Sequence, residues 1–278
     1  MNLMKTQKEL AIIIIDCLTK YKLELKDKFE SSIQEVGVRY CYLDDLLPDS
    51  IANRICSVFP DKVNMRLMSS FRERKYTSKK FDQFDQILKN MTFAIQDAGV
   101  IRLIEEITGI VAQSPDPSLY AGGLSLMEKG NFLNPHIDNS HEMTRSMYRT
   151  LNLLYYVNKN WSFEKGGNLE LWDKKVKRNV TIESQFNRLV IMETNPWSWH
   201  SVSPVTANEN RMCVSNYYFS KISPIGREYF NVTSFSARPE QCFRRIVSGL
   251  DNGIRNMLRL IKPIGIGKKD IYVQNNNM

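Results

Sequence analysis

The chain has 278 residues, of which 42% are hydrophobic and 24% charged, and its formal net charge is +8 at pH 7. This length and balance are typical of a globular protein with a full hydrophobic core, and no apolar run reaches the length of a membrane span. The five cysteines are odd in number and scattered, which favours reduced thiols over a disulfide framework. We therefore expect a cytoplasmic protein with no membrane partner.

The first third of the chain has mainly helical patterns. Residues 1 to about 35 mix apolar positions with Lys and Glu at helical spacing. Residues 40–109 are expected to form a short strand followed by helices. Among these, Phe81 to Gly99 is expected to form one long helix, and Val100 to Thr108 a shorter helix that ends at Gly109.

From Gly122 the pattern changes to short segments that are rich in β-forming residues and separated by turn residues. The strands are expected at 151–157, 168–172, 181–182, 188–192 and 212–219. Strands at this spacing indicate an antiparallel sandwich or jelly roll rather than a parallel α/β sheet. After Ser220 the pattern returns to loop, followed by a helix expected at 240–260.

Basic residues gather near the end of the chain: Arg238, Arg244, Arg245, Arg255, Arg259, Lys262, Lys268 and Lys269. No nucleic-acid-binding motif accompanies them. We favour a solvated helix face over a nucleic-acid surface. A basic funnel for a small anionic substrate is a third interpretation.

Two of the three histidines belong to one constellation, formed by His136, Asp138 and His200. On an extended strand end, residues two apart point to the same side, so His136 and Asp138 can share one metal ion. Two imidazoles and one carboxylate are the ligands of non-haem Fe(II) oxygenases, which leave the other coordination positions open. Arg211, on the next expected strand, could bind a carboxylate through two hydrogen bonds.

Each of these residues has an ordinary structural alternative when taken alone. His136 and His200 could be packed histidines, and Asp138 could cap the following turn. The order and spacing of all four residues within a β-rich region favour the metal site.

Three segments of the sequence resemble the Fe(II)/2-oxoglutarate-dependent dioxygenases, in particular their prolyl 4-hydroxylase-like branch. The segments are Glu128 to Asn139, Arg149 to Leu169 with the Gly166-Gly167 turn, and Arg188 to Arg211 with His200-Ser201-Val202. The similarity runs from about Leu124 to Phe219. It implies an α+β fold with a mostly β core, a double-stranded β-helix of the jelly-roll or cupin type, with N-terminal helices packed on the sheet and a C-terminal helical extension.

The resemblance implies a role for each matching residue. His136, Asp138 and His200 would ligate Fe(II), and Arg211 would bind the distal carboxylate of 2-oxoglutarate. Other residues expected to line the cosubstrate pocket are Tyr156, Asn152, Leu154 and Tyr217. Asn152 and Leu154 are included because they share a strand face with Tyr156. Core packing with a satisfied hydroxyl is the alternative for Tyr156 and Tyr217.

One departure concerns the strand before His136, where many relatives carry a cosubstrate-binding tyrosine and this sequence has Leu126 and Met127. Asp138 is intact, whereas halogenating relatives have a small residue there, so hydroxylation or a related oxidation is expected. Candidate substrate-binding residues are His141, Arg145 and Trp199. A surface-loop histidine and a packed tryptophan are the alternatives for His141 and Trp199.

The expected cofactor and cosubstrates are Fe(II), 2-oxoglutarate and O2, with ascorbate as a candidate reductant. The leading hypothesis is hydroxylation of a small-molecule or amino-acid-like substrate with release of succinate and CO2. A peptidyl, prolyl-type hydroxylase is the alternative, and a non-catalytic binding protein on an oxygenase scaffold is a hypothesis of a different class.

The expected organisation is an N-terminal helical extension at 1–39, the dioxygenase domain at 40–222, and a C-terminal helical extension at 223–278. The sequence indicates no particular oligomeric state.

Overall fold

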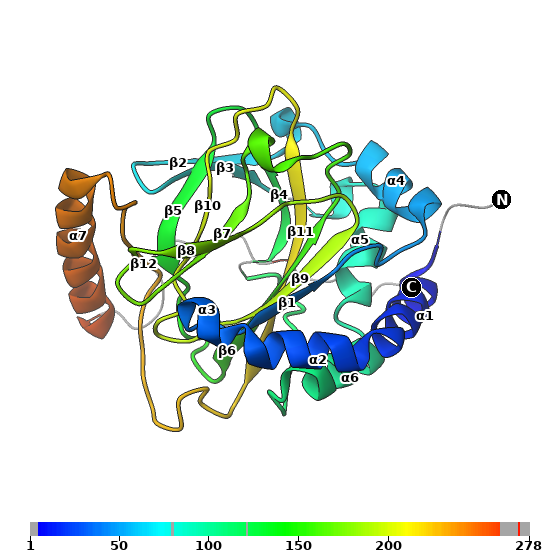
Figure 1. Cartoon of the computed structure of the whole chain (residues 1–278), viewed down its shortest axis with the longest axis horizontal. Helices are drawn as coiled ribbons and strands as arrows, with labels where there is room; N and C mark the ends of the chain where they lie inside the picture. The colour runs from blue at the N-terminus through cyan, green and yellow to red at the C-terminus, as the bar shows by residue number, and fades with distance from the viewer. Residues whose placement is uncertain (1–4, 79–80, 121, 262–271, 273–278) are drawn as a thin grey trace.

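The computed structural model describes residues 5–78, 81–120, 122–261 and 272 (Figure 1). In these residues, twelve antiparallel strands form one sheet with the order β1-β9-β6-β11-β4-β3-β5-β10-β7-β8, while β12 pairs with β5 and β2 with β3. The strands are β1 (Tyr40–Leu43), β2 (Arg66–Ser69), β3 (Glu73–Thr77), β4 (Gly123–Met127), β5 (Phe132–Ile137), β6 (Tyr148–Tyr156), β7 (Leu169–Trp172), β8 (Asn179–Ile182), β9 (Arg188–Glu193), β10 (His200–Val202), β11 (Arg211–Ser220) and β12 (Ser234–Phe235).

The sheet curls so that its two halves face each other. The side chains of strand β6 show which cluster packs on each face of the sheet. Leu151, Leu153 and Tyr155 point to the large core that the helices cover. Tyr156, in contrast, packs with Leu169 and Leu171 of β7 in a second cluster between the two halves. The structure thus confirms the expected mostly β core of jelly-roll type, and its interior is where inward-facing side chains of both halves meet.

Helices cover the outer face of the sheet on the side of β6 and β9 (Figure 1). They are α1 (Gln7–Lys20), α2 (Lys22–Ser31), α4 (Asp49–Ser57), α5 (Gln86–Ala94) and α6 (Ala98–Thr108). The short helix α3 (Ile33–Val36) instead contributes Val36 to the cluster between the two halves of the sheet. The short 3-10 turns are η1 (Lys62–Asn64), η2 (Phe81–Gln83) and η3 (Phe163–Lys165). Helix α1 starts with a capping box, in which Thr6 and Glu9 satisfy each other's backbone N–H groups. Its Leu10, Ile14 and Leu18 are buried at helical spacing, so α1 lies on the core as predicted.

Two predictions for the first third of the chain were wrong. The expected helix at 81–99 is divided, because Asp85 and Asp97 each accept a backbone hydrogen bond as N-caps and start new helices, α5 and α6. Helix α6 ends at Gly109 in a left-handed conformation, as predicted. Residues 66–77, expected to be helical, form the β2–β3 hairpin, which joins β4 to β5.

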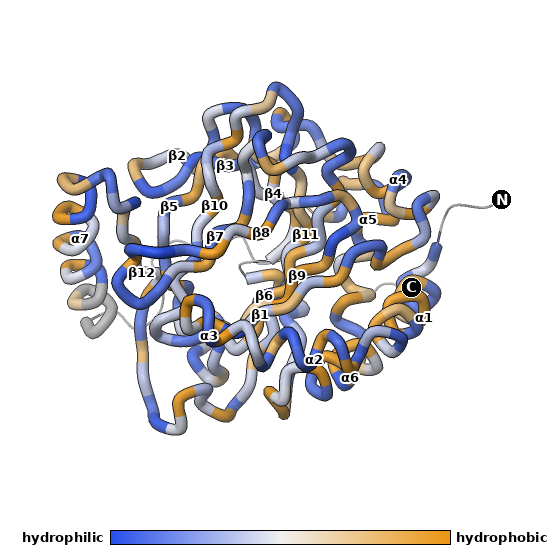
Figure 2. Tube along the Cα trace, viewed as in Figure 1, coloured by the Kyte–Doolittle hydropathy of each residue, from blue (hydrophilic) through white to orange (hydrophobic). Residues whose placement is uncertain are grey.

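The seventh helix, α7 (Cys242–Ile261), lies at the opposite end of the molecule from α1 (Figures 1 and 2). It agrees with the helix predicted at 240–260 to within two residues. The basic residues Lys262, Lys268 and Lys269 lie outside the described residues. Among the helices that the structure describes, none has the length and hydropathy needed to cross a bilayer.

Candidate metal centre

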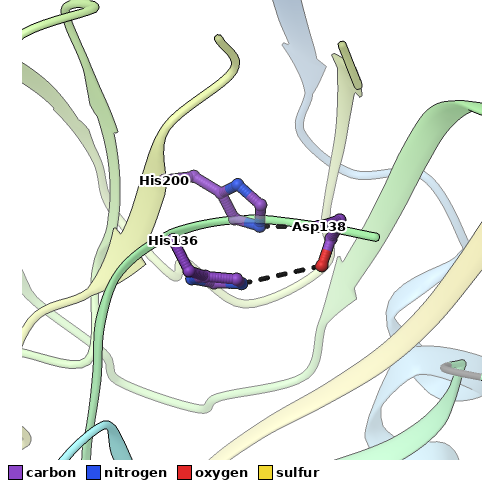
Figure 3. Close-up of side chains that lie close together, drawn as sticks. All are labelled: His136, Asp138 and His200. Carbon is purple, nitrogen blue, oxygen red and sulfur yellow. Dashed lines mark ion pairs between the residues drawn. The ribbon is translucent and has the colours of Figure 1, made fainter. Parts of the chain in front are cut away.

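His136 and His200 lie directly opposite each other on the paired strands β5 and β10. Their ring centroids are 4.1 Å apart, and Asp138 follows immediately after β5. The Nε2 atoms of His136 and His200 each lie 3.7 Å from a carboxylate oxygen of Asp138, Oδ1 and Oδ2 respectively (Figure 3). Within the described part of the chain, these residues are the one group of three potential ligands close enough to share an ion.

The second ring nitrogen of each histidine fixes the orientation of the imidazole. His136 Nδ1 lies 3.0 Å from the carbonyl oxygen of Asn134, and His200 Nδ1 lies 3.0 Å from that of Ser198. A carbonyl can only accept, so each Nδ1 is assigned as the donor, which leaves the lone pair on Nε2. Both Nε2 lone pairs face Asp138. A metal-binding histidine has the same arrangement, in which one ring nitrogen donates a hydrogen bond and the other binds the ion.

Asp138 is buried, and its Oδ2 has no hydrogen-bond partner among the described residues. Burial alone raises the pKa of this carboxyl, but the guanidinium of Arg149, 3.3 Å away, and the two imidazoles outweigh it and bring the pKa below its usual value. Burial and the neighbouring His200 lower the pKa of His136 to about 3, so His136 is neutral at physiological pH. A buried carboxylate with an unpartnered oxygen beside two imidazoles fits a divalent cation.

The segment after β11 supports this centre from outside the predicted motifs. Phe235 of β12 stacks on the His136 ring, with centroids 5.3 Å apart and planes 19° apart. Asn231 Nδ2 donates to the backbone carbonyl of Asp138 at 2.8 Å. The sequence analysis missed both residues, because a two-residue strand and a loop asparagine carry no periodic signal.

Arg211 stands at the start of β11 and reaches into the interior between the two halves of the sheet. Its Nε donates to the carbonyl of Gly167 at 3.1 Å, and its Nη1 lies 3.5 Å from Ser125 Oγ. The guanidinium carbon is 4.8 Å from the ring centre of Tyr156. Gly167 has φ +65°, and a Cβ there would lie 3.1 Å from Arg211 Cγ, so glycine permits the close approach.

Tyr156 is buried, and its hydroxyl has no hydrogen-bond partner among the described residues. Burial raises the pKa of Tyr156 to about 12, so the hydroxyl keeps its proton and can donate. A protonated hydroxyl beside a buried guanidinium suits a ligand carboxylate, which accepts from both. Arg211 and Tyr156 therefore lie together as the sequence predicted.

The other predicted cosubstrate residues divide between two surroundings. Asn152 Nδ2 lies 3.5 Å from the Tyr217 hydroxyl, and the Asn152 Oδ1 is buried without a partner. Tyr217 lies under the guanidinium of Arg149, whose carbon is 4.0 Å from the ring centre, so this pair is on the Asp138 side of the interior. Burial raises the pKa of Tyr217 well above its usual value. Leu154 instead packs against the apolar cluster that contains Tyr156.

The three candidate substrate residues surround the segment 225–231. His141 is buried and not on a surface loop: its ring packs on Tyr148 with centroids 4.3 Å apart, and on Phe230 at 5.9 Å. Burial lowers the pKa of His141. The guanidinium carbon of Arg145 lies 3.9 Å from the centre of the Phe230 ring.

Trp199 lines a pocket of 440 Å³. The residues that share the pocket are Ile137, Pro196, Trp197, Ile225, Arg227, Tyr229, Phe230, Asn231, Ser234 and Asn252. Ile137 alternates with the ligands on its strand, so this pocket adjoins β5 on the face opposite the two imidazoles. His141, Arg145 and Trp199 thus share one aromatic neighbourhood.

Comparison with known proteins agrees with this geometry. Residues 122–219 match the family model of the 2OG-Fe(II) oxygenase superfamily. No curated protein matches the sequence.

Two solved structures share the fold. One is a prolyl hydroxylase from Trichoplax adhaerens in complex with a hypoxia inducible factor oxygen degradation domain peptide fragment; it is 18% identical, with a TM-score of 0.50 over 73% of this chain and 92% of that one. The other is a prolyl 4-hydroxylase from Phytophthora capsici, 15% identical, with a TM-score of 0.52 over 90% of this chain and 78% of that one.

Proposed function

Because the chain belongs to the 2OG-Fe(II) oxygenase superfamily through residues 122–219, we propose that it hydroxylates an unactivated C–H bond of a small-molecule or amino-acid-like substrate. Enzymes of this class use Fe(II) as cofactor and 2-oxoglutarate and O2 as cosubstrates, and succinate and CO2 are the expected coproducts. The observation that carries the proposal is the convergence of His136, Asp138 and His200 on one point. We further propose residues 40–222 as the oxygenase domain, with helical extensions at 1–39 and 223–278.

The ligand roles follow from the donor atoms. The iron would be held by His136 Nε2, His200 Nε2 and the Asp138 carboxylate. Both Nε2 atoms face this carboxylate, and Asp138 Oδ2 has no hydrogen-bond partner among the described residues. When bound, the iron with 2-oxoglutarate and O2 supplies the oxidising chemistry, and the protein supplies position and a dry interior. Arg149 pairs with the Asp138 carboxylate and favours its charged form.

Arg211 and Tyr156 would bind the distal carboxylate of 2-oxoglutarate. The Arg211 guanidinium is buried, and the hydroxyl of Tyr156 has no competing partner among the described residues. Two converging donors fix both the depth and the direction of a dicarboxylate. Asn152 and Tyr217 would then lie nearer the metal end of the same cavity.

The polar groups left over beside Asp138 support a compact polar substrate. Arg149 Nε and Nη2 and Asn152 Oδ1 are buried without hydrogen-bond partners among the described residues. Buried donors and acceptors of this kind require a polar ligand or water, because leaving them unpaired costs about 1–3 kcal/mol each. A small molecule with both donor and acceptor groups, such as an amino-acid-like compound, matches this set.

The test is turnover by the purified protein supplied with Fe(II) and 2-oxoglutarate in air. Succinate formation would be followed while metabolite mixtures and, separately, proline-containing peptides are screened for products heavier by one oxygen atom. Oxygenation of a metabolite supports the proposal, and oxygenation confined to peptides would assign the peptidyl alternative. If the protein binds neither Mn(II) nor 2-oxoglutarate, the non-catalytic binding protein on an oxygenase scaffold replaces both enzyme hypotheses.

The cysteines, none of which forms a disulfide in the described residues, support a cytoplasmic setting.

A further inference from the structure

Helix α7 packs on the protein through its polar side and exposes its apolar side to solvent. Five large apolar side chains at helical spacing are more than half exposed: Phe243 (78%), Ile246 (66%), Leu250 (67%), Ile254 (56%) and Met257 (57%). A surface helix of a globular protein normally buries this stripe and exposes its polar face. The arrangement of α7 is the reverse, and a contiguous exposed apolar face of this kind indicates an interaction surface.

The contacts on the opposite side of α7 explain why the helix is held in this orientation. Asn252 exchanges two hydrogen bonds with the backbone of Phe235, at 2.9 and 2.6 Å. Arg255 donates to the carbonyl of Thr233 at 2.9 Å, Asp251 pairs with Arg72, and Ser248 is buried. These specific bonds fix the rotation of α7 about its axis, so the apolar stripe cannot turn inward without breaking them.

Cations border the stripe near the start of α7. Arg245 donates to the carbonyls of Lys175 and Val176, which joins the helix to the turn between β7 and β8 (Figure 1). The exposed basic residues of this turn and of the helix are Lys174, Lys175, Lys177, Arg178 and Arg244.

The carboxylates of the same region do not offset this charge. Asp251 is engaged by Arg72 and Arg255, and Asp173 accepts from the backbone of Lys177 and lies 3.8 Å from Arg178. Glu240, just before the helix, is exposed. The net local charge is therefore positive.

We propose that α7 docks the protein onto an anionic phospholipid surface. The apolar stripe would enter the boundary between headgroups and acyl chains, while the bordering cations meet the negative headgroups. A helix parallel to the surface does not need the high hydropathy of a membrane span, which α7 lacks. Pairing two stripes in parallel would bring the basic turns of both copies toward each other, which disfavours that arrangement of a second copy.

The experiment is co-sedimentation of the full chain with vesicles of phosphatidylcholine alone or with added phosphatidylglycerol. We expect binding only to the anionic vesicles, weakened by high salt because of screening. Leu250→Glu places a charge in the apolar stripe and should reduce the partition coefficient about tenfold or more. The double variant Lys174→Glu/Lys177→Glu should reduce it about tenfold through charge alone.

Leu23→Glu is the matched control, since Leu23 on α2 is 74% exposed but lies on another helix. It should bind vesicles as the unaltered protein does, and thermal unfolding should show all variants folded. Absence of binding to anionic vesicles overturns the proposal, as does full binding by Leu250→Glu. A dimer seen by light scattering that Leu250→Glu dissociates, without vesicle binding, would assign the stripe to a second copy instead.

Discussion

Arg149 and Asp138 form a buried ion pair, with Nη1 of the arginine 3.3 Å from Oδ1 of the proposed iron ligand. Arg149 is 1% exposed, and its guanidinium lies over Tyr217 and Phe219. A buried arginine is costly unless it is paired, and here its partner is a carboxylate that also faces two imidazoles. The pair therefore links the start of β6 to the candidate metal centre.

We predict that Arg149→Met weakens metal binding about 10- to 100-fold, the usual effect of removing a residue that orients a ligand. Without the guanidinium, the pKa of Asp138 rises and the carboxylate loses its support. Anaerobic Mn(II) titration measures this affinity, and Arg149→Lys should recover part of it because the charge is retained.

Arg188→Met is the control for Arg149→Met. Arg188 is also buried, but it pairs with Asp44, with its Nε 2.6 Å from Oδ1. Its loss should lower the thermal stability without changing the Mn(II) affinity. Equal Mn(II) affinities for Arg149→Met and the unaltered protein would show that Arg149 does not position Asp138.

Mn(II) should stabilise the folded protein, because the ion binds a site that the unfolded chain lacks. At a concentration 100 times the dissociation constant, the gain is about 2.7 kcal/mol, or roughly 5 °C in Tm for a chain of this size. His200→Ala should abolish the shift, whereas His141→Ala should keep it, since His141 contacts Tyr148 and Ser140 and not the ligand set. A shift that survives in His200→Ala would remove His200 from the metal centre.

The proposed metal ligands could be brought together from the sequence because their geometry is local or follows from strand pairing. Alternation along β5 places His136 and Asp138 on one side. The return of His200 needs one antiparallel pairing, with His136 as its partner. Arg211 and Tyr156 followed from family resemblance, and their proximity is now visible at 4.8 Å.

Other parts of the site depend on contacts between distant residues, which leave no periodic pattern. Arg149 was given no role from the sequence, and its burial on β6 depends on its pairing with Asp138, a residue of another strand's end. The β2–β3 hairpin has half-exposed, polar strands, so its sequence resembles a solvated helix, and its pairing with β4 and β5 decides the structure.

The cysteines should differ in reactivity according to burial. Burial raises the pKa of Cys41 to about 12 and that of Cys213 to about 11, so at pH 8 both are almost entirely thiols and shielded from solvent. Cys242 is exposed at the start of α7. Iodoacetamide at pH 8 should therefore modify Cys242 first, with Cys41 and Cys213 reacting only after unfolding, as peptide mass spectrometry would show. Early modification of Cys213 in the folded protein would mean that the interior beside Arg211 is open to solvent.

Arg211 and Tyr156 should contribute unequally to 2-oxoglutarate affinity. Arg211→Met removes the buried guanidinium that is proposed to bind the carboxylate, and truncating one partner of such a pair costs about 2–5 kcal/mol, or at least about 30-fold in affinity. Tyr156→Phe removes one hydrogen bond worth about 1 kcal/mol, or about fivefold.

Anaerobic calorimetry with Mn(II) and 2-oxoglutarate measures both effects. Tyr155→Phe is the matched control, because the Tyr155 hydroxyl donates to Asn187 on the opposite face of β6 at 2.8 Å. It should lower stability and leave 2-oxoglutarate affinity unchanged. If Tyr155→Phe weakened 2-oxoglutarate binding as much as Tyr156→Phe, the loss would reflect a general disturbance of β6, and the assignment of Tyr156 to the carboxylate would have to be withdrawn.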